Sequence, residues 1–424
     1  MIDLIVDILK ENGIEHYLIH DTIEESAELF FIQKTLDMRR KKKVHLAEVT
    51  VYRDFEKDGK KCRGFADTNL SSSMTRQELE ERIRSAYFAA SFVPNPAYEL
   101  PKGKREEQIV MDSDMTEHSL EESAAIMTEA LFSGDREPDV FLNSAELFVC
   151  RNTITIVNSE GIHVSFVKYK VSGEFVAQCK KPQDVETYES FSYENLACED
   201  LKQKVLDTLM LTRDRAMAKE APAAGTYDVI LSGDYVGDLM SYYMSRSGAA
   251  SIYHGYSNFK NGESAQGEEI KGEKLNAWLL PSDPYSFEGI PMVRRQLMQD
   301  GILKAIHGNC RISSYLGIEP IGSYTKMELK CGTVPFAEMK AQKGLHIVNF
   351  SDFQMDSFSG HFMGEIRLAY LNDGTRVIPV TGGSINGSIF EAQKEFVFSV
   401  EQQKSGRFEG PYAVSLKNVS VAGN

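Results

Sequence analysis

The chain has 424 residues, more than one compact core usually accommodates, so we expect two or three domains. Hydrophobic residues make up 42% of the sequence and charged residues 26%, the balance of an ordinary soluble globular protein. The formal net charge of −15 argues against nucleic acid as a partner, because affinity for phosphate backbones depends on clustered Lys and Arg. The basic run at 39–43 is a local exception, and a solvated strand entry or loop is favoured there over a binding patch.

The first residues predict an amphipathic helix and no secretory signal. Ile2, Ile5 and Ile8 fall on one helical face, while Asp3 and Asp7 interrupt the apolar run that a signal peptide needs. Elsewhere no stretch approaches the roughly 18 consecutive apolar residues of a membrane span. The six cysteines are scattered and form no CxxC pair, which favours reduced thiols in a cytoplasmic protein without membrane contact.

Residues 1–100 are predicted to form a first α+β subdomain. The segment 44–55 is rich in β-branched and aromatic residues and predicts a strand. A helix is predicted at 76–92, with Thr75 as its N-cap. The following segment, from Pro94 to about Asp114, lacks periodicity and is expected to be a connection between subdomains.

Residues 115–219 are predicted to form a second α+β subdomain. A helix is expected at each end with strands between them, and the last two strands are joined by a hairpin turn at 158–161 that ends in glycine. The predicted helices span 118–132 and 193–219, and the predicted strands span 145–150, 153–157 and 162–169.

Beyond the predicted linker at 221–225, the composition changes to short runs rich in Gly, Val, Ile and Phe. Residues 226–424 are therefore expected to form a mostly β C-terminal domain, with helices inserted at 234–246 and at about 390–396. The fold class predicted for the whole chain is α+β, with N-terminal α/β subdomains followed by this mostly β domain.

Short motifs in a fixed order connect the C-terminal half with a known family, and the turn at 158–161 is similarly placed. They are Tyr227–Leu231, Gly301–Lys304, Ser313–Gly317, Phe358–Gly360, Tyr370–Gly374, Val377–Val380, Ser384–Gly387 and Val419–Gly423. In this order they resemble the TldD/PmbA family, to which the name "modulator of DNA gyrase" is attached. The resemblance covers about 200 residues and implies a PmbA/TldD-like fold.

In that family, TldD members are metallopeptidases that hold zinc through a helix-borne His-Glu-x-x-x-His motif and a cysteine near the C-terminus. TldE/PmbA members lack these ligands and act as the partner subunit. The resemblance places the two His positions at Ser241 and Arg246 and the Glu position at Tyr242, and the matching C-terminal stretch, 405–410, has no Cys. It therefore implies the TldE/PmbA branch, with no catalytic residue, no metal and no cofactor in this chain.

Without the resemblance, the segment 234–248 is still predicted to be a helix, with Asp234 as its N-cap. Ser241, Tyr242 and Arg246 lie off the centre of its buried face, where they could line a groove or an interface. The apolar stripe that predicts this buried face consists of Val236, Leu239, Met240, Tyr243 and Met244.

Two histidines are candidate cleft residues. His254 follows the 234–248 helix, and His361 lies in a Ser-Gly-His-Phe segment. For each of them, a structural role is the favoured alternative. His307 and Cys310 are three residues apart, a spacing that can bind metal, but no third ligand lies near them in the sequence, so a structural pair is favoured.

The leading hypothesis is a catalytically silent subunit that works with a TldD-like metallopeptidase on a peptide substrate and forms a homodimer in isolation. An extended peptide suits a mostly β domain, because a sheet edge can accept an added strand. The alternative is a stand-alone homodimeric peptide-binding or regulatory protein without peptidase activity. Direct contact with DNA is disfavoured by the acidic composition.

Overall fold

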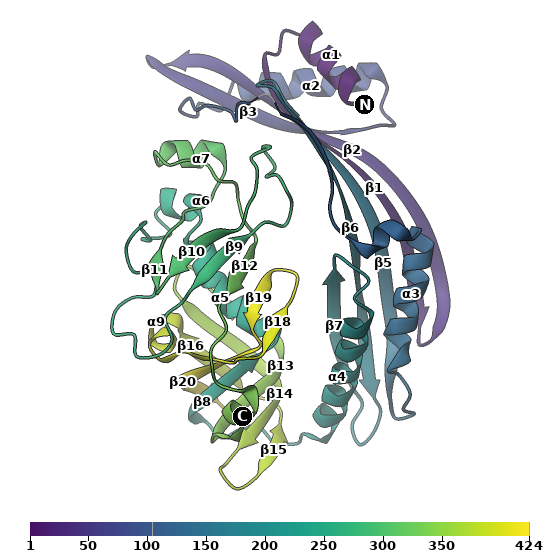
Figure 1. Cartoon of the computed structure of the whole chain (residues 1–424), viewed down its shortest axis with the longest axis vertical. Coiled ribbons are helices and arrows are strands. Elements are labelled where there is room, and N and C mark those ends of the chain that lie inside the picture. The colour runs from purple at the N-terminus through teal and green to yellow at the C-terminus, as the bar shows by residue number, and fades with distance from the viewer. Residues whose placement is uncertain (104, 424) are drawn as a thin grey trace.

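A computed structural model of the protein describes residues 1–103 and 105–423 (Figure 1). Its N-terminal half is built around one large curved sheet, and its C-terminal half contains two smaller sheets with short helices between them. The predicted α+β class is confirmed. Within the described residues, no helix is both long and apolar enough to cross a membrane.

The N-terminal sheet has the order β3-β2-β1-β5-β6-β4, and β7 also pairs with β6. Neighbouring strands are antiparallel, except that β4 runs parallel to β6. The strands are β1 (His16–Ile32), β2 (Thr35–Lys57), β3 (Lys60–Ser71), β4 (Arg105–Val110), β5 (Val140–Asn158), β6 (Ile162–Cys179) and β7 (Val185–Tyr193).

This single sheet corrects the picture of two separate N-terminal subdomains, at 1–100 and 115–219. Strand β1 pairs with β2 along one edge and with β5 along the other, so strands from both segments share one hydrogen-bonded ladder. The two strands predicted at 145–150 and 153–157 are one strand, because β5 continues through Arg151, whose guanidinium donates to Glu25 on β1.

Four helices cover one face of the sheet. They are α1 (Ile2–Glu11), α2 (Arg76–Ala90), α3 (Leu120–Ser133) and α4 (Cys198–Met217). Helices α1 and α2 pack against β1, β2 and β3 in one hydrophobic cluster, and α3 and α4 pack against β5, β6 and β7 in another. The predicted N-cap Thr75 is confirmed, and the structure adds a capping box, since Thr75 and Glu78 exchange hydrogen bonds at the start of α2.

The C-terminal half contains two sheets. The first has the order β11-β10-β9-β12-β19-β18, and the second has the order β13-β8-β20-β16-β14-β15, with β13 also paired to β14, so that the strands close into a ring. The first sheet comprises β9 (Ala277–Leu280), β10 (Arg295–Gln299), β11 (Ile302–Leu303), β12 (Lys326–Leu329), β18 (Gln402–Lys404) and β19 (Phe408–Pro411). The second comprises β8 (Gly225–Ser232), β13 (Gly344–Met355), β14 (His361–Asn372), β15 (Val377–Val380), β16 (Ser384–Ser388), β17 (Val397–Phe398) and β20 (Ala413–Ala422).

Short helices connect the strands of this half. Helix α5 lies between the sheets, since it contacts β8 and β13 of one and β19 of the other. The helices are α5 (Asp234–Arg246), α6 (Ala249–Tyr253), α7 (Cys310–Tyr315), α8 (Phe336–Ala341) and α9 (Ile389–Ala392), followed by a 3-10 turn, η2 (Gln393–Glu395). A further 3-10 turn, η1 (Asp114–Glu117), precedes α3 in the N-terminal half.

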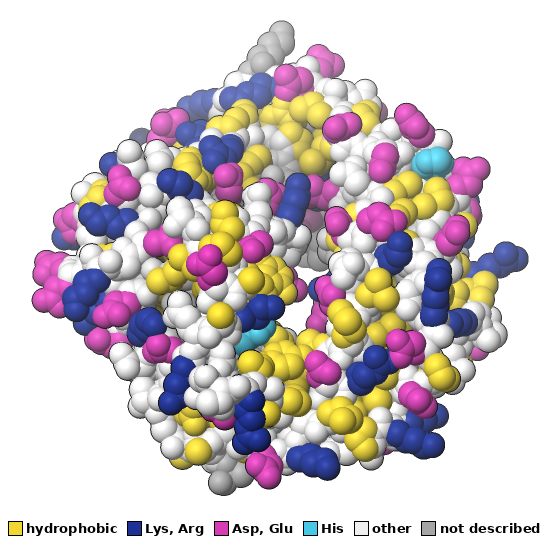
Figure 2. Space-filling view, turned by 60° about the horizontal axis from the view of Figure 1, so that its bottom comes forward, with side chains coloured by type: hydrophobic (Ala, Val, Ile, Leu, Met, Phe, Trp, Pro, Cys, Tyr) yellow, Lys and Arg dark blue, Asp and Glu magenta, His cyan; other side chains and the backbone are white. Residues whose placement is uncertain are grey.

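A loop between β9 and β10 joins the two halves of the molecule. Phe287 stacks on His20 of β1, with ring centroids 4.6 Å apart, and Asp283 accepts a 2.6 Å hydrogen bond from Lys168 of β6. Tyr285 packs into a cluster with apolar side chains of β1, β5 and β6. At the opposite end of the molecule, the hydroxyl of Tyr370 on β14 donates a hydrogen bond to the carboxylate of Asp214 on α4. Figure 2 shows a deep hollow in one face of the molecule.

Candidate functional site

Helix α5 begins where strand β8 ends, and the transition depends on a glycine. Gly233 has φ +66°, a conformation that side chains rarely adopt, and its N–H donates to the carbonyl of Tyr412. Gly233 is therefore the N-cap, and the prediction that Asp234 caps the helix is wrong. Asp234 is the first helical residue, and its carboxylate lies 3.8 Å from the ammonium of Lys204 on α4.

The apolar stripe predicted for α5 is confirmed at its centre. Val236, Leu239, Met240 and Tyr243 are buried in the main hydrophobic cluster of the C-terminal half, and Met244 packs against it. The Tyr243 hydroxyl also donates a 2.7 Å hydrogen bond to the side chain of Gln393. The opposite face of the helix is exposed.

Two of the three positions that the resemblance assigned to a metal motif are built into packing contacts, and the third is exposed. Ser241 is exposed, and its hydroxyl donates to the carbonyl of Asp238 one turn earlier. Tyr242, expected off the buried stripe, is 1% exposed. Its ring makes edge-to-face contacts with Phe259 and Phe390 at centroid distances of 6.2 and 6.0 Å. An aromatic cluster thus occupies the Glu position.

Arg246 holds the segment that follows the helix. Its guanidinium donates to the carbonyl of Tyr256 and, at 2.7 Å, to the side-chain oxygen of Asn258. The same group lies 5.7 Å from the ring centroid of Tyr242 and 5.5 Å from that of Phe259. Arg246, at the position where the resemblance places the second His, therefore links α5 to the 254–259 segment.

The segment 405–410, where the resemblance expects the C-terminal cysteine, does lie against α5. Gly237 faces Phe408 so closely that a Cβ added there would be 2.8 Å from the Phe408 Cβ. A glycine inside a helix costs stability, and here it permits β19 to approach the helix backbone. The fold thus brings together two segments about 160 residues apart, to which the resemblance assigns the two parts of the motif.

Beside this contact, the exposed face of α5 carries a perturbed carboxyl. Desolvation raises the pKa of Asp238 to about 6, with a further contribution from the charge of Asp234, and the nearby Arg407 opposes the shift. Neither α5 nor the segment 405–410 places a thiol or an imidazole next to Ser241.

The side chains present do not fit the zinc ion of the family motif. Arg246 is permanently cationic, and burial raises the pKa of the Tyr242 phenol above its ordinary value, which keeps it protonated. Zinc in proteins is bound by thiolate, imidazole and carboxylate groups. Among the described residues, no group of three or more His, Cys, Asp or Glu side chains is arranged to hold a metal ion.

The two candidate cleft histidines border an exposed aromatic surface. The His254 ring lies 5.9 Å from that of Tyr256, which lies 5.0 Å from that of Phe358. His361 is exposed three residues after Phe358, and its N–H donates to the hydroxyl of Ser359. Both histidines thus lie beside the segment that Arg246 holds.

His307 has the structural role favoured by its sequence context. Its Nε2 lies 3.1 Å from the carbonyl of Met244, and its Nδ1 accepts the N–H of Tyr324. Burial lowers its pKa, so that the neutral tautomer with a proton on Nε2 satisfies both contacts. Cys310 begins α7, where its N–H donates to the carboxylate of Glu288.

One contact between polar side chains was missed by the sequence analysis. The hydroxyl of Ser232, at the end of β8, lies 2.9 Å from Nε2 of His346 on β13. Burial lowers the pKa of His346 to about 4. The parallel register of β8 and β13, which places Ile230 beside His346, has no signal in the local sequence.

The whole chain shares its fold with solved structures. A protein from Thermotoga maritima, named a candidate modulator of a DNA gyrase, is 18% identical with a TM-score of 0.77, covering 99% of each chain. A Bacteroides thetaiotaomicron protein of similar name is 15% identical with a TM-score of 0.77, covering 100% of this chain and 98% of that one. TldE from Thermococcus kodakarensis is 16% identical with a TM-score of 0.77, covering 99% and 100%.

No curated protein matches the chain. Residues 224–423 match the family model described as the PmbA/TldA metallopeptidase C-terminal domain. This match covers α5, the segment 405–410 and the strands that bring them together. The C-terminal part of the chain thus matches the PmbA/TldA metallopeptidase family model, and the whole chain shares the fold of the two proteins named modulators of DNA gyrase and of TldE.

Proposed function

We propose that this chain is the non-catalytic, TldE/PmbA-type subunit of a two-subunit metallopeptidase that acts on small or unfolded peptides. The proposal rests on one observation, that α5 is retained without the side chains that would bind a metal. The helix and its contact with β19 are intact, while Ser241 and Arg246 stand where the resemblance places the two His ligands, and Tyr242 stands where it places the Glu.

The contacts of these residues support a role other than catalysis. A degraded metal site is expected to leave small or solvated side chains, whereas Tyr242 is fully buried and Arg246 donates to two acceptors. The site is thus stabilised in its metal-free form. We infer that α5 and its contact with β19 are retained because they give this chain the shape that it needs to pair with another subunit.

In this proposal, a TldD-like subunit supplies the metal and the catalytic base, and this chain supplies part of the surface that guides the peptide. The exposed face beside α5, with His254, His361, Tyr256 and Phe358, is the part that we assign to peptide or partner contact. We place the complex in the cytoplasm, where the six cysteines would stay reduced.

The test is reconstitution with the His-Glu-x-x-x-His-bearing relative from the same genome. Peptidase activity on an unfolded peptide is measured for each protein alone and for the mixture, and zinc is measured by elemental analysis. We expect no cleavage and no stoichiometric zinc for this chain alone, and a gain of at least tenfold for the mixture over the relative alone. One tightly bound zinc per chain, or cleavage by this chain alone, would overturn the proposal.

A matched pair of variants adds specificity to this experiment. Tyr256→Ala removes an exposed ring from the surface beside α5, and Tyr188→Ala removes an exposed ring from the distant strand β7. Reduced activity of the mixture with the first variant alone supports the assigned surface. Equal activity with both would place the peptide or partner elsewhere. No gain in any mixture would favour the stand-alone peptide-binding or regulatory protein.

A further inference from the structure

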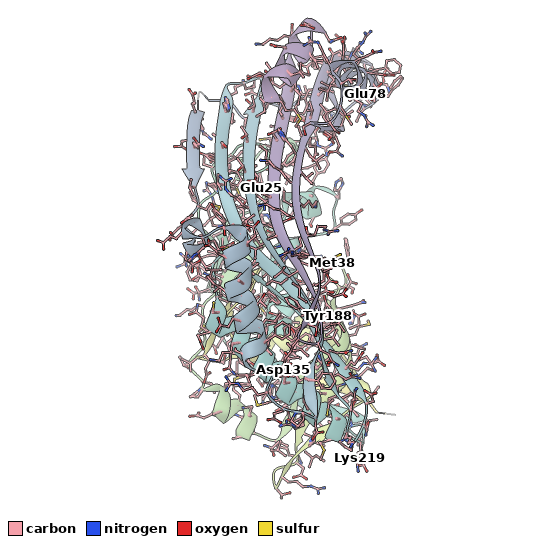
Figure 3. All side chains as sticks on the ribbon, turned by 90° about the vertical axis from the view of Figure 1, so that its right-hand side faces the viewer. Glu25, Met38, Glu78, Asp135, Tyr188 and Lys219 are labelled. Atoms are coloured by element: carbon pink, nitrogen blue, oxygen red, sulfur yellow. The ribbon has the colours of Figure 1, made fainter. Side chains whose placement is uncertain are left out.

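The N-terminal sheet has one face that α3 and α4 cover and a second face that these helices leave open. The helices pack on alternate residues of the strands, among them Ala27 of β1, Val149 of β5 and Val171 of β6. The residues between these point to the second face, because successive side chains of a strand alternate. In Figure 3, α3 lies in front of the strands, so the second face is turned away from the viewer.

A hollow of about 520 Å³ lies on the second face, and residues of β1, β5 and β6 line it. We call it the sheet hollow, and its charged and central residues are Glu24, Glu28, Cys150, Asn152, Lys168 and Lys170. These side chains are sorted by strand. The two carboxylates belong to β1, the two ammonium groups belong to β6, and the uncharged floor between them belongs to β5.

The register of the sheet fixes which of these side chains are neighbours. Glu24 is opposite Asn152, and Asn152 is opposite Lys168, so these three form one row across the sheet. In the next row on the same face, Cys150 is opposite Lys170. Burial raises the pKa of Cys150 to about 11, and the nearby carboxylates contribute to the shift, so the thiol is uncharged at neutral pH. An acidic wall and a basic wall thus face each other across a neutral floor.

The basic wall and the floor have donors that are free to bind. Lys168 donates a 2.6 Å hydrogen bond to Asp283 on the loop that joins the two halves of the molecule. Lys170, in contrast, is exposed and forms no ion pair within residues 1–103 and 105–423. The side-chain amide of Asn152 likewise forms no hydrogen bond in the described part of the chain. An ammonium group and an amide are therefore available to an acceptor in the hollow.

On the acidic wall, Glu24 is the carboxylate that can accept a ligand. Glu28 is buried, accepts a 2.9 Å hydrogen bond from Ser26 and pairs with Arg40. Among the described residues, Glu24 pairs only with Lys42, at 3.3 Å, and both of these side chains are more than a third exposed. Exposed pairs of this kind contribute little to stability. The ammonium group of a ligand can therefore replace Lys42 beside Glu24 at little cost.

Carboxylates and ammonium groups on opposite sides of one hollow match a ligand that carries both charges, and we propose that the sheet hollow binds a short free peptide. The α-ammonium of the peptide contacts Glu24, its carboxylate contacts Lys170, and a backbone carbonyl accepts a hydrogen bond from Asn152. A metal cation is disfavoured because Lys168 and Lys170 repel it. A phosphate is disfavoured because Glu24 and Glu28 repel it.

The distance between the walls sets the length of the peptide. Glu24 and Lys170 are two strands apart, about 9.6 Å, and one row apart, about 6.8 Å, so their backbones are separated by roughly 12 Å. An extended chain spans at most about 3.5 Å per residue, so a single amino acid cannot reach both walls and a tripeptide covers about 10 Å. The long, flexible side chain of Lys170 covers the remainder. The volume of the hollow also falls in the range of small-ligand sites, about 300–1,000 Å³.

This site is separate from the surface beside α5 to which the proposed function assigns peptide or partner contact. Because the sheet hollow contacts both charged ends of its ligand, it takes a free short peptide and not a segment within a longer one. Short free peptides are what a peptidase releases. The inference rests on the proposed function only for this identification of the ligand as a product.

The test is isothermal titration calorimetry of the full chain with trialanine at low ionic strength. We expect one peptide to bind per chain, with an affinity that falls as salt is added. N-acetyltrialanine lacks the ammonium group and trialanine amide lacks the carboxylate. Each should bind at least about tenfold more weakly, because each loses a hydrogen bond between charged groups. Trialanine that does not bind, or that binds equally well with either end blocked, would overturn the site.

Two variants assign the ends of the peptide to the two walls. Glu24→Gln should weaken the binding of trialanine at least about tenfold and leave the binding of N-acetyltrialanine unchanged. Lys170→Gln should weaken the binding of trialanine to a similar extent and leave the binding of trialanine amide unchanged. If neither variant altered the affinity for trialanine, the peptide would be bound elsewhere and the inference would be wrong.

Each variant has a matched control, and circular dichroism checks the fold of all four. Glu25→Gln changes the next residue of β1, labelled in Figure 3, whose side chain points to the face that the helices cover. Lys219→Gln changes an exposed lysine at the lower end of the molecule in Figure 3. Both controls should bind trialanine as the wild-type chain does. Losses in the controls equal to those in the variants would show a general effect of charge and would contradict the site.

Failure of this inference and failure of the proposed function are distinguishable. A chain that binds no trialanine but still stimulates the metallopeptidase would lose only the sheet hollow as a peptide site. A chain that binds trialanine as expected but also holds one zinc ion, or cleaves peptides alone, would lose only the proposed function.

Discussion

The guanidinium of Arg246 lies over the ring of Tyr242, with 5.7 Å between its Cζ and the ring centroid. The resemblance to TldD members assigns a metal ligand and the general base to these two positions. Here they contact each other and Phe259, and the buried ring faces the cation whose remaining donors hold the 254–259 segment. The site is a packed unit, and its parts can be tested separately.

The Tyr242 ring is expected to stabilise the C-terminal domain. Tyr242→Ala removes a fully buried aromatic ring and should lower the free energy of unfolding by about 3–4 kcal/mol. Tyr242→Phe should change it by less than about 1 kcal/mol, because no hydrogen bond of the hydroxyl is present among the described residues. Urea denaturation followed by tryptophan fluorescence measures both. Equal losses for the two variants would show that the hydroxyl, and not the ring, is what matters.

Arg246 is expected to control the mobility of the segment after α5. Arg246→Lys keeps the charge but cannot make the two-pronged contact with Tyr256 and Asn258, and should cost about 1–2 kcal/mol. Hydrogen–deuterium exchange of peptides covering 253–259 should accelerate. Ser245→Ala, an exposed change on the same helix, is the control and should leave exchange unaltered. If exchange were unchanged in Arg246→Lys, the guanidinium of Arg246 would not be what restricts the motion of this segment.

The locally encoded features of the fold were predictable from the sequence. Thr75 caps α2 as predicted, and the hairpin turn closes as expected, with Asn158 accepting the N–H of Glu160 and Gly161 at φ +96°. These features depend on residues within four positions of one another. The buried stripe of α5 follows for the same reason, since helical spacing alone defines it.

The features that depend on distant partners were not predictable. The sequence separates 1–100 from 115–219, but the pairing of β1 with β5 joins them. Strand β4, inside the predicted connection, is ordered by its parallel partner β6. Tyr242 was expected outside the buried stripe and is buried because Phe390, far along the chain, covers it. Only the family resemblance connected α5 with 405–410.

The stability of the protein is expected to fall in mild acid, with His346 as a named contributor. Burial lowers its folded-state pKa from the ordinary 6.5 to about 4, so between these values the unfolded chain binds more protons than the folded chain. The stabilisation is complete above pH 6.5 and is lost as the pH falls toward 4. At pH 5, the His346 contribution to this loss should be about 2 kcal/mol.

His346→Gln isolates this contribution, since glutamine does not titrate and can still hydrogen-bond to Ser232. Urea midpoints of the wild-type chain and the variant are compared at pH 7 and pH 5. The difference between the two pH values should be smaller in the variant. An identical pH dependence would mean that His346 is as easily protonated in the folded chain as in the unfolded one.

The last prediction concerns the contact between the two segments to which the resemblance assigns the metal motif, α5 and 405–410. On helix propensity alone, Gly237→Ala should stabilise α5 by about 1 kcal/mol. The added Cβ would, however, be 2.8 Å from the Phe408 Cβ and 3.1 Å from its Cγ, so β19 would have to move. Overpacking of this kind costs about 1–3 kcal/mol, which outweighs the gain, and we expect a lower urea midpoint. Ser245→Ala on the exposed side of the helix should not lower it. If Gly237→Ala raised the midpoint instead, β19 would be free to shift, and close contact with α5 would not explain the glycine.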